Sequence, residues 1–230
     1  MEQIIIGGFF IIFTIIVYLL MNKLYLKYSF PLFTPILTAA AVIIGFLLIF
    51  HVSYPTYMIG GSWINKLLGP AVVALAFPLY KQRKTLLKYR SIILSGVIGG
   101  VLFGIFSGLL MAEILGINQN VIASILPKSL TTPVAIQIST NLGGIPAMTA
   151  IFVMVAGLSG AIIGPMVLQL FQIQNPISKG IALGSASHAV GTSKALEYGE
   201  LPFSMSSVSM TLSAILGSII SPIIAMMFHI

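Results

Sequence analysis

Long apolar runs without charge make up most of this sequence, and they constrain its fold more than any other feature. The first run, from Ile4 to Met21, contains no charged residue and is long enough to cross a bilayer. Of the 230 residues, 58% are hydrophobic and 7% are charged, and the mean hydropathy is +1.10. A water-soluble domain needs more polar surface than this. The sequence therefore predicts an all-α polytopic membrane protein with a single integral domain over residues 1–230.

Spans of about 20 residues with short connections leave room for about seven or eight membrane segments. The first run has Glu2 where a signal peptide carries basic residues, and no small-residue cleavage site follows it. We therefore expect this run to be a retained helix. The expected segments cover about 4–21, 31–50, 63–80, 91–115, 119–142, 145–171, 179–195 and 203–228.

Basic residues set the expected orientation, because the cytoplasmic loops of membrane proteins are enriched in Lys and Arg. Lys23 and Lys27 follow the first segment, which predicts an external N-terminus. The connection 51–61 has no Lys or Arg, as an external loop would. Five bases crowd into the connection 81–90, namely Lys81, Arg83, Lys84, Lys88 and Arg90. Between two apolar spans, this cluster favours a cytoplasmic loop near anionic lipid headgroups over a nucleic-acid site.

A polar patch interrupts the expected segment 119–142 at its middle. Pro127 and Pro133 bracket it, and its polar members are Lys128, Ser129, Thr131 and Thr132. Because a proline disfavours helical backbone at the residue before it, we expect an unwound centre. The patch is either a surface loop between two short apolar pieces or a discontinuous or re-entrant helix that lines a cavity. The second interpretation is preferred.

A second polar run lies within the apolar stretch 179–197. It comprises Ser185, Ser187, His188, Gly191, Thr192, Ser193 and Lys194. In a continuous helix, Gly180, Gly184, His188 and Thr192 would form one stripe facing a neighbouring helix. Alternatively, the chain unwinds near 185–187. His188 either handles solute or protons or hydrogen-bonds a hydroxyl across a helix interface. Lys194 either belongs to the same polar site or lies at a segment end and reaches the membrane surface.

Small residues recur at four-residue steps in two of the expected segments, and at steps of three and four residues in a third. This spacing predicts ridges on which another helix packs closely, with a role in lining a path as the alternative. The residues are Gly96, Gly100, Gly104 and Gly108, then Gly157, Gly160 and Gly164, and finally Ser209, Ser213, Gly217 and Ser221.

The charges available inside the membrane favour an anionic solute. The chain has no Asp, and none of its Glu residues lies at the centre of an apolar segment. The candidates for buried charge are Lys128, Lys194 and titratable His188, and the N-termini of broken helices add partial positive charge. The sequence contains no serine–histidine–carboxylate set, metal-ligand cluster or phosphate-binding glycine loop, and it has no cysteine. We therefore expect no enzyme activity, no cofactor and no bound metal.

Three stretches of the sequence resemble the LrgB/CidB family of bacterial membrane proteins, and its CidB-like branch in particular. They are GGSWIN at 60–65 with PAVVALAFPLYKQR at 70–83, LPKSLTTPVAIQIS at 126–139 with GG at 143–144, and NPISKGIALGSASHAVGTSKALE at 175–197. The resemblance implies a multi-pass plasma-membrane protein that forms homo- or hetero-oligomers and has a small LrgA/CidA-type partner. Members of the family are described as holin-like or antiholin-like modulators of murein hydrolase activity and cell lysis, and relatives as carriers of small organic acids.

We expect this chain to carry a small organic acid anion of the pyruvate, lactate or glycolate class by alternating access. A holin-like component that modulates lysis through oligomers with the small partner is the alternative. An inverted-repeat, transporter-like fold is a further possibility, since 70–80 and 126–139 are weakly similar. This similarity is too weak to assign symmetry. The candidate solute-binding residues are Lys128, Ser129, Thr131, Thr132, Ser185, Ser187, His188, Gly191, Thr192 and Lys194.

Overall fold

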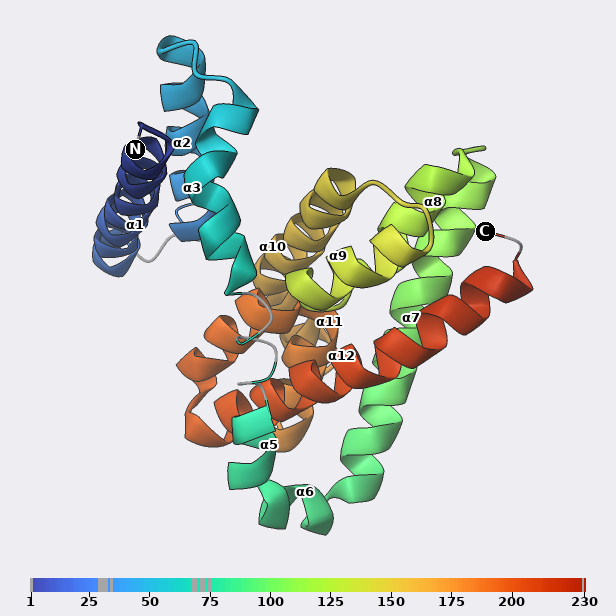
Figure 1. Cartoon of the computed structure of the whole chain (residues 1–230). Coiled ribbons are helices and arrows are strands. Elements are labelled where there is room, and N and C mark those ends of the chain that lie inside the picture. Colours follow the sequence, from blue (N-terminus) through green and yellow to red (C-terminus); the bar gives the residue numbers. More distant parts are fainter. Residues whose placement is uncertain are drawn as a thin grey trace. The chain divides into compact units, whose positions relative to one another are not determined.

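The computed structural model describes residues 2–28, 33, 35–67, 70, 73, 76–228 and 230. All regular secondary structure in these residues is helical, which confirms the predicted helical class (Figure 1). The chain forms two compact units, Met1–Ala71 and Val72–Ile230.

The N-terminal unit contains three helices, α1 (Glu2–Tyr28), α2 (Pro35–Ile49) and α3 (Tyr54–Lys66). The helices α1 and α3 pack closely where Gly60 meets α1, because a methyl group at position 60 would lie 2.9 Å from Cβ of Phe10. The hydroxyls of Thr14 and Tyr57 lie 3.1 Å apart across the same interface. The glycine thus allows α1 and α3 to approach closely, and the hydroxyl pair adds a polar contact beside the edge-to-face rings of Phe10 and Tyr57.

The helix α3 corrects the expected external loop 51–61. Its residues are less apolar than the flanking runs, which is why they suggested a loop. The side chain of Ser53 accepts a hydrogen bond from the Thr56 amide at 3.4 Å, and Pro55 lies in the first turn, so a cap starts the helix. The helix then ends at Lys66, inside the expected segment 63–80. Residues 68–69, 71–72 and 74–75 of that segment lie outside the described residues, and a separate short helix begins at Ala76.

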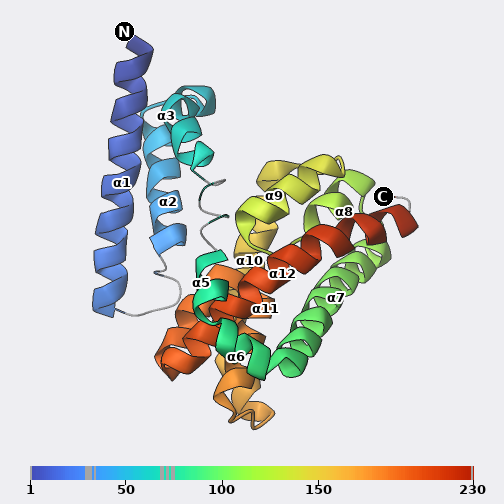
Figure 2. The ribbon, with the colours of Figure 1, turned by 60° about the horizontal axis from the view of Figure 1, so that its bottom comes forward.

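The C-terminal unit holds the remaining described helices (Figure 2). They are α5 (Ala76–Lys81), α6 (Arg83–Lys88), α7 (Arg90–Ile114), α8 (Gln119–Ile125), α9 (Thr132–Asn141), α10 (Pro146–Leu170), α11 (Pro176–Ala195), the 3₁₀ turn η2 (Leu196–Tyr198) and α12 (Glu200–Met227). In the described part of the chain, α1, α7, α10 and α12 are long and apolar enough to cross a membrane. The total of seven or eight segments stays a prediction.

The glycine ridge of α7 packs against neighbouring helices and links, as predicted. Methyl groups at Gly96 and Gly100 would lie 2.7 Å from the side chain of Ile181 and 2.9 Å from Oγ of Ser185, both on α11. At Gly104, a methyl group would lie 2.7 Å from Oγ of Ser129. Each missing side chain therefore makes room for a residue of another element.

The pair α8 and α9 is interrupted by non-helical residues 126–131, which confirms the predicted unwound centre. Leu126 and Leu130 are only 1% and 2% exposed, so the link is not a surface loop of this unit. The side-chain amide of Asn120 donates a 3.0 Å hydrogen bond to the Gly143 carbonyl. The start of α8 therefore lies beside the turn that follows α9.

Candidate functional site

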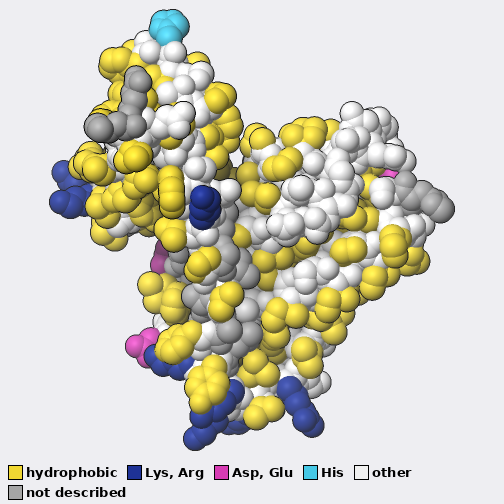
Figure 3. Space-filling view, viewed as in Figure 1, with side chains coloured by type: hydrophobic (Ala, Val, Ile, Leu, Met, Phe, Trp, Pro, Cys, Tyr) yellow, Lys and Arg dark blue, Asp and Glu magenta, His cyan; other side chains and the backbone are white. Residues whose placement is uncertain are grey.

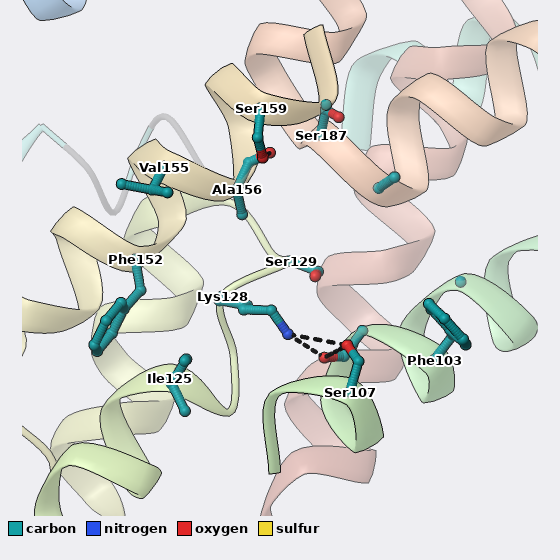
Figure 4. Close-up of a pocket in the computed structure, with 14 residues that line it drawn as sticks. Phe103, Ser107, Ile125, Lys128, Ser129, Phe152, Val155, Ala156, Ser159 and Ser187 are labelled. Atoms are coloured by element: carbon teal, nitrogen blue, oxygen red, sulfur yellow. Dashed lines mark hydrogen bonds between the residues drawn. The ribbon is translucent and has the colours of Figure 1, made fainter. Parts of the chain in front are cut away.

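The candidate site is a cavity of about 460 Å³ in the C-terminal unit, open at the surface where its lining residues Phe103 and Val155 are exposed (Figure 4). The helices α7, α10 and α11 line it together with the end of α8 and the α8–α9 link. Its polar side chains are Ser107, Lys128, Ser129, Ser159 and Ser187. None of the described residues that line it is acidic.

Lys128 supplies the only charge in the described lining of this cavity. Its ammonium donates hydrogen bonds to the backbone carbonyl of Gly104 and, at 3.3 Å, to Oγ of Ser107. Gly108 makes room for the ammonium, because a methyl group there would lie 2.8 Å from Nζ. The cation is thus held against α7 by neutral groups, so its charge is not compensated there.

Ser187 meets the cavity from α11, just before a break in that helix. His188 has φ 41° and ψ −125°, which is non-helical backbone inside α11. Ser187 is 1% exposed, and its hydroxyl has no hydrogen-bond partner among the described residues. The break falls just beyond the stretch 185–187 where unwinding was considered, so α11 is discontinuous.

The break also corrects the stripe expected for a continuous helix. Gly184 lies against α12, where a methyl group would lie 2.8 Å from Cα of Ser206. Thr192 also faces α12, because its hydroxyl lies 2.9 Å from Oγ of Ser206. His188 instead faces α10, where a methyl group at Gly157 would lie 2.6 Å from Cε1 of its ring. The positive φ at His188 breaks the helical register that the predicted stripe required.

His188 is 3% exposed and does not line the cavity. Its Nε2 has no hydrogen-bond partner within the described structure, so the interpretation of a hydroxyl-bonded interface histidine finds no support at that atom. The ring approaches the backbone of Val153 on α10. The His188 ring is therefore buried where α11 packs against α10, outside the cavity that the preceding residue, Ser187, lines.

The other predicted site residues lie outside the cavity lining. Ser185 donates to the Ile181 carbonyl at 2.7 Å, as an ordinary helical serine does. Gly191 lies against the Leu183 backbone, where the two parts of α11 approach each other. Thr131 is buried with a hydroxyl that has no partner in the described part of the chain, and Thr132 begins α9.

Lys194 is likewise outside the cavity and forms a 2.7 Å ion pair with Glu197. Its charge is therefore compensated locally. Of the ten candidate residues, the cavity brings together Lys128, Ser129 and Ser187.

Several lining residues were not among the candidates. Ser107 is three residues beyond Gly104, so it lies on the same face of α7 as the glycine ridge, and that spacing could have indicated it. Ser159 precedes Gly160, which belongs to the predicted α10 stripe. The aromatic rings of Phe103 and Phe152 carry no comparable signal in the sequence.

Comparison with known proteins identifies a family and several relatives. The LrgB-like family model matches residues 14–227. The chain is 56% identical over 230 residues to the uncharacterized protein YxaC of Bacillus subtilis strain 168, covering 100% of both chains. It is 40% identical over 219 residues to the holin-like protein CidB of Staphylococcus aureus strain Mu50, covering 95% of this chain and 96% of the relative. No solved structure matches it.

Proposed function

Because this chain belongs to the LrgB-like family, we propose that it is a bacterial plasma-membrane protein that carries a small organic acid anion of the pyruvate, lactate or glycolate class. One observation carries the proposal, namely the Lys128 ammonium in a cavity without an acidic residue in its described lining. A cation inside an apolar protein is costly unless a partner compensates its charge. A carboxylate is the partner that this cavity lacks.

The polar groups around Lys128 suit a small acid with an oxo or hydroxyl group. The ammonium would pair with the carboxylate, since charged hydrogen bonds of this kind are short and strong. The side chains of Ser107 and Ser129 line the same cavity, and their hydroxyls can donate to the remaining oxygens. Ser187 also belongs to the lining, and its buried hydroxyl would join them once the solute displaces its surroundings. To bind, Lys128 would exchange the Gly104 carbonyl for the carboxylate.

The helix arrangement supports alternating access as the mechanism. Interrupted helices at membrane depth are typical of secondary transporters, in which they line the solute site. Here the site is built by the non-helical link 126–131 and by α11 just before its break at His188. We propose that α8 and α9 form a re-entrant pair in one integral domain. We also propose that the buried His188 ring, which packs against α10, holds the neighbouring Ser187 in position.

Uptake into proteoliposomes tests the carrier proposal. The protein is reconstituted with and without a small LrgA/CidA-type partner, and uptake of labelled pyruvate, lactate and glycolate is measured. We expect saturable uptake of at least one acid, and at least a tenfold loss in Lys128→Met, which removes the charge but keeps the side-chain length. Lys194→Gln is the matched control, because Lys194 is paired outside the cavity. Absence of saturable uptake under both conditions would refute the carrier.

The alternative is a holin-like component that acts through oligomers with the small partner. The relative named a holin-like protein, 40% identical to this chain, favours it. A pore-forming assembly would release a trapped dye such as carboxyfluorescein from the same proteoliposomes, whereas a carrier would retain the dye while taking up acid. Dye release that is unchanged in Lys128→Met would support the holin-like function.

A further inference from the structure

We propose that the cavity at Lys128 is one section of a solute passage that continues along α10 into a second cavity, with Gly160 and Ser187 at the junction. The second cavity has a volume of about 340 Å³ and lies between α10 and the first part of α11. The proposal rests on the carrier function and adds the route by which the anion leaves the lysine.

Shared lining residues join the two cavities. Ser159, Gly160, Ala186 and Ser187 line both of them. From this junction, the first cavity extends toward Phe152 on α10 and Lys128 on the link. The second extends in the opposite direction along α10, and its further lining includes Ile163, Val167, Leu168 and Ile173. Together, the two cavities therefore run along α10 from Phe152 to Leu168.

The joined length approaches the thickness of a membrane. Phe152 and Leu168 are 16 residues apart on α10, and at about 1.5 Å of rise per residue they are separated by about 24 Å. The hydrocarbon core of a bilayer is about 30 Å thick. A helix that crosses the membrane would thus carry the passage across most of its depth.

The junction combines a missing side chain with an unused hydroxyl. A methyl group on Gly160 would overlap Oγ of Ser187, so glycine is required for the serine to occupy its place. In a regular helix, Ser187 could donate to the Leu183 carbonyl, as Ser185 does to Ile181. Gly191 lies against that carbonyl instead, and the Ser187 hydroxyl stays without a partner in the described structure.

The two sections differ in chemistry. The first section contains the lysine and several hydroxyls, which can bind an anion. The second is lined by aliphatic side chains beyond Ser159 and Ser187, and its described lining has no charged group. An anion would leave its binding site past Ser187 and would cross the second section only with its hydration water, because the aliphatic lining offers it no hydrogen bond there.

Cysteine accessibility tests the passage directly, because the chain has no native cysteine. A thiol reacts with a membrane-impermeant methanethiosulfonate as its thiolate, which forms in water and not in lipid. Ile163→Cys places a thiol in the second section, and Ile162→Cys is its matched control. The two side chains are adjacent on α10 and similarly exposed, 48% and 45%, but Ile162 lines neither cavity. The protein is used full length in proteoliposomes.

We expect Ile163→Cys to react at least tenfold faster than Ile162→Cys, and Ser107→Cys to react in the first section. Equal, slow reaction at 163 and 162 would overturn the passage and leave a groove filled by lipid. The carrier proposal is judged separately by uptake. Saturable uptake without labelling at 163 would refute the passage alone, and labelling without uptake would refute the carrier alone.

Gly160→Ala tests the junction. We expect it to lower uptake at least tenfold and to slow labelling at Ser187→Cys by a similar factor, while Ser107→Cys still reacts. A cooperative thermal unfolding transition in detergent shows that the variant is folded. Gly99→Ala is the control, because a methyl group at Gly99 meets nothing within 4 Å in the described structure. Wild-type uptake in a folded Gly160→Ala variant would contradict the junction.

Discussion

At the scale of single residues, glycines decide where the polar side chains of the candidate site lie. Gly108 makes room for the Lys128 ammonium, Gly160 for the Ser187 hydroxyl and Gly157 for the His188 ring. These glycines lie on α7 and α10, whereas the polar side chains come from the α8–α9 link and α11. The stripes of small residues and the two polar runs, which looked like separate features of the sequence, therefore form one set of contacts.

The first prediction concerns Gly157→Ala. A methyl group there would lie 2.6 Å from Cε1 of His188, and the ring is buried and rigid, so α10 and α11 must separate to accept it. We expect a loss of stability of about 1–3 kcal/mol, as for other overpacked cores. Thermal unfolding in detergent measures it, with Gly99→Ala as the control. Equal unfolding temperatures for the two variants would show that the ring does not lie against Gly157.

At the scale of single elements, the break in α11 is the feature that organises the site. The φ and ψ of His188, 41° and −125°, resemble the first central position of a type II′ turn, which favours glycine. A side chain in such a region costs about 1–3 kcal/mol unless surrounding contacts compensate it. In the structure, the His188 ring packs against Gly157 on α10, and this contact can compensate the backbone cost.

The second prediction separates the backbone of His188 from its ring. His188→Gly should be more stable than His188→Val by about 1–3 kcal/mol, because valine is β-branched and strained at positive φ. If α11 were continuous through this position, valine would be the more stable of the two, since glycine is the weaker helix former. The order of the two unfolding temperatures in detergent therefore distinguishes a broken from a continuous helix. The contacts of the ring do not affect this comparison, because both variants lack it.

Much of the element order could be predicted from the sequence, because long uncharged runs and prolines report on local structure. The expected segments 91–115, 145–171 and 203–228 correspond to α7, α10 and α12, and Pro127 with Pro133 indicated the interruption at 126–131. The break at His188 was not placed, because it depends on tertiary contacts. One is Gly157 against the ring, and another is Gly191 against the Leu183 backbone. Neither contact follows from local spacing.

The candidate site was predictable to a similar extent. Lys128, Ser129 and Ser187 could be selected as polar groups in apolar segments, and the cavity brings them together. Lys194 could not be excluded, because its pairing with Glu197 depends on the turn η2. Phe103 and Phe152 could not be selected, since an apolar lining residue looks like any other apolar residue in such a chain.

The third prediction concerns the packing of α1 against α3 in the N-terminal unit. Gly60→Ala would bring a methyl group within 2.9 Å of Cβ of Phe10 and against the Gly7 carbonyl, which is backbone and cannot rotate away. We expect a loss of about 1–3 kcal/mol in the stability of this unit. Gly45→Ala on α2 is the matched control, because it meets nothing within 4 Å among the described residues and should gain up to about 1 kcal/mol. Limited proteolysis in detergent compares them.

At the scale of the whole molecule, the surface is that of a protein in a bilayer. Large apolar side chains are exposed along the long helices of both units, for example Ile12 on α1, Phe103 on α7 and Ile151 on α10. In the C-terminal unit, Lys and Arg side chains gather at the end that carries α5 and α6 (Figure 3). The five bases of this cluster, Lys81, Arg83, Lys84, Lys88 and Arg90, are exposed. The exposed apolar side chains and the basic cluster at one end together predict how the protein is oriented in the membrane.

The fourth prediction is that orientation. The basic cluster at 81–90 should face the cytoplasm and the α2–α3 connection, which has no Lys or Arg, the outside. Single cysteines at the exposed positions Leu87 and Tyr54 report the two faces. On intact cells, an impermeant maleimide should label Tyr54→Cys and leave Leu87→Cys unlabelled until the membrane is opened.

Neutralising the cluster tests the cause of that orientation. If the bases hold this end in the cytoplasm, replacing all five with glutamine should expose Leu87→Cys to the external reagent in part of the population, because only Lys23, Lys27 and scattered later lysines then remain to orient the chain. An unchanged pattern would assign the orientation to Lys23 and Lys27. External labelling of Leu87→Cys in the otherwise native chain would contradict the predicted orientation.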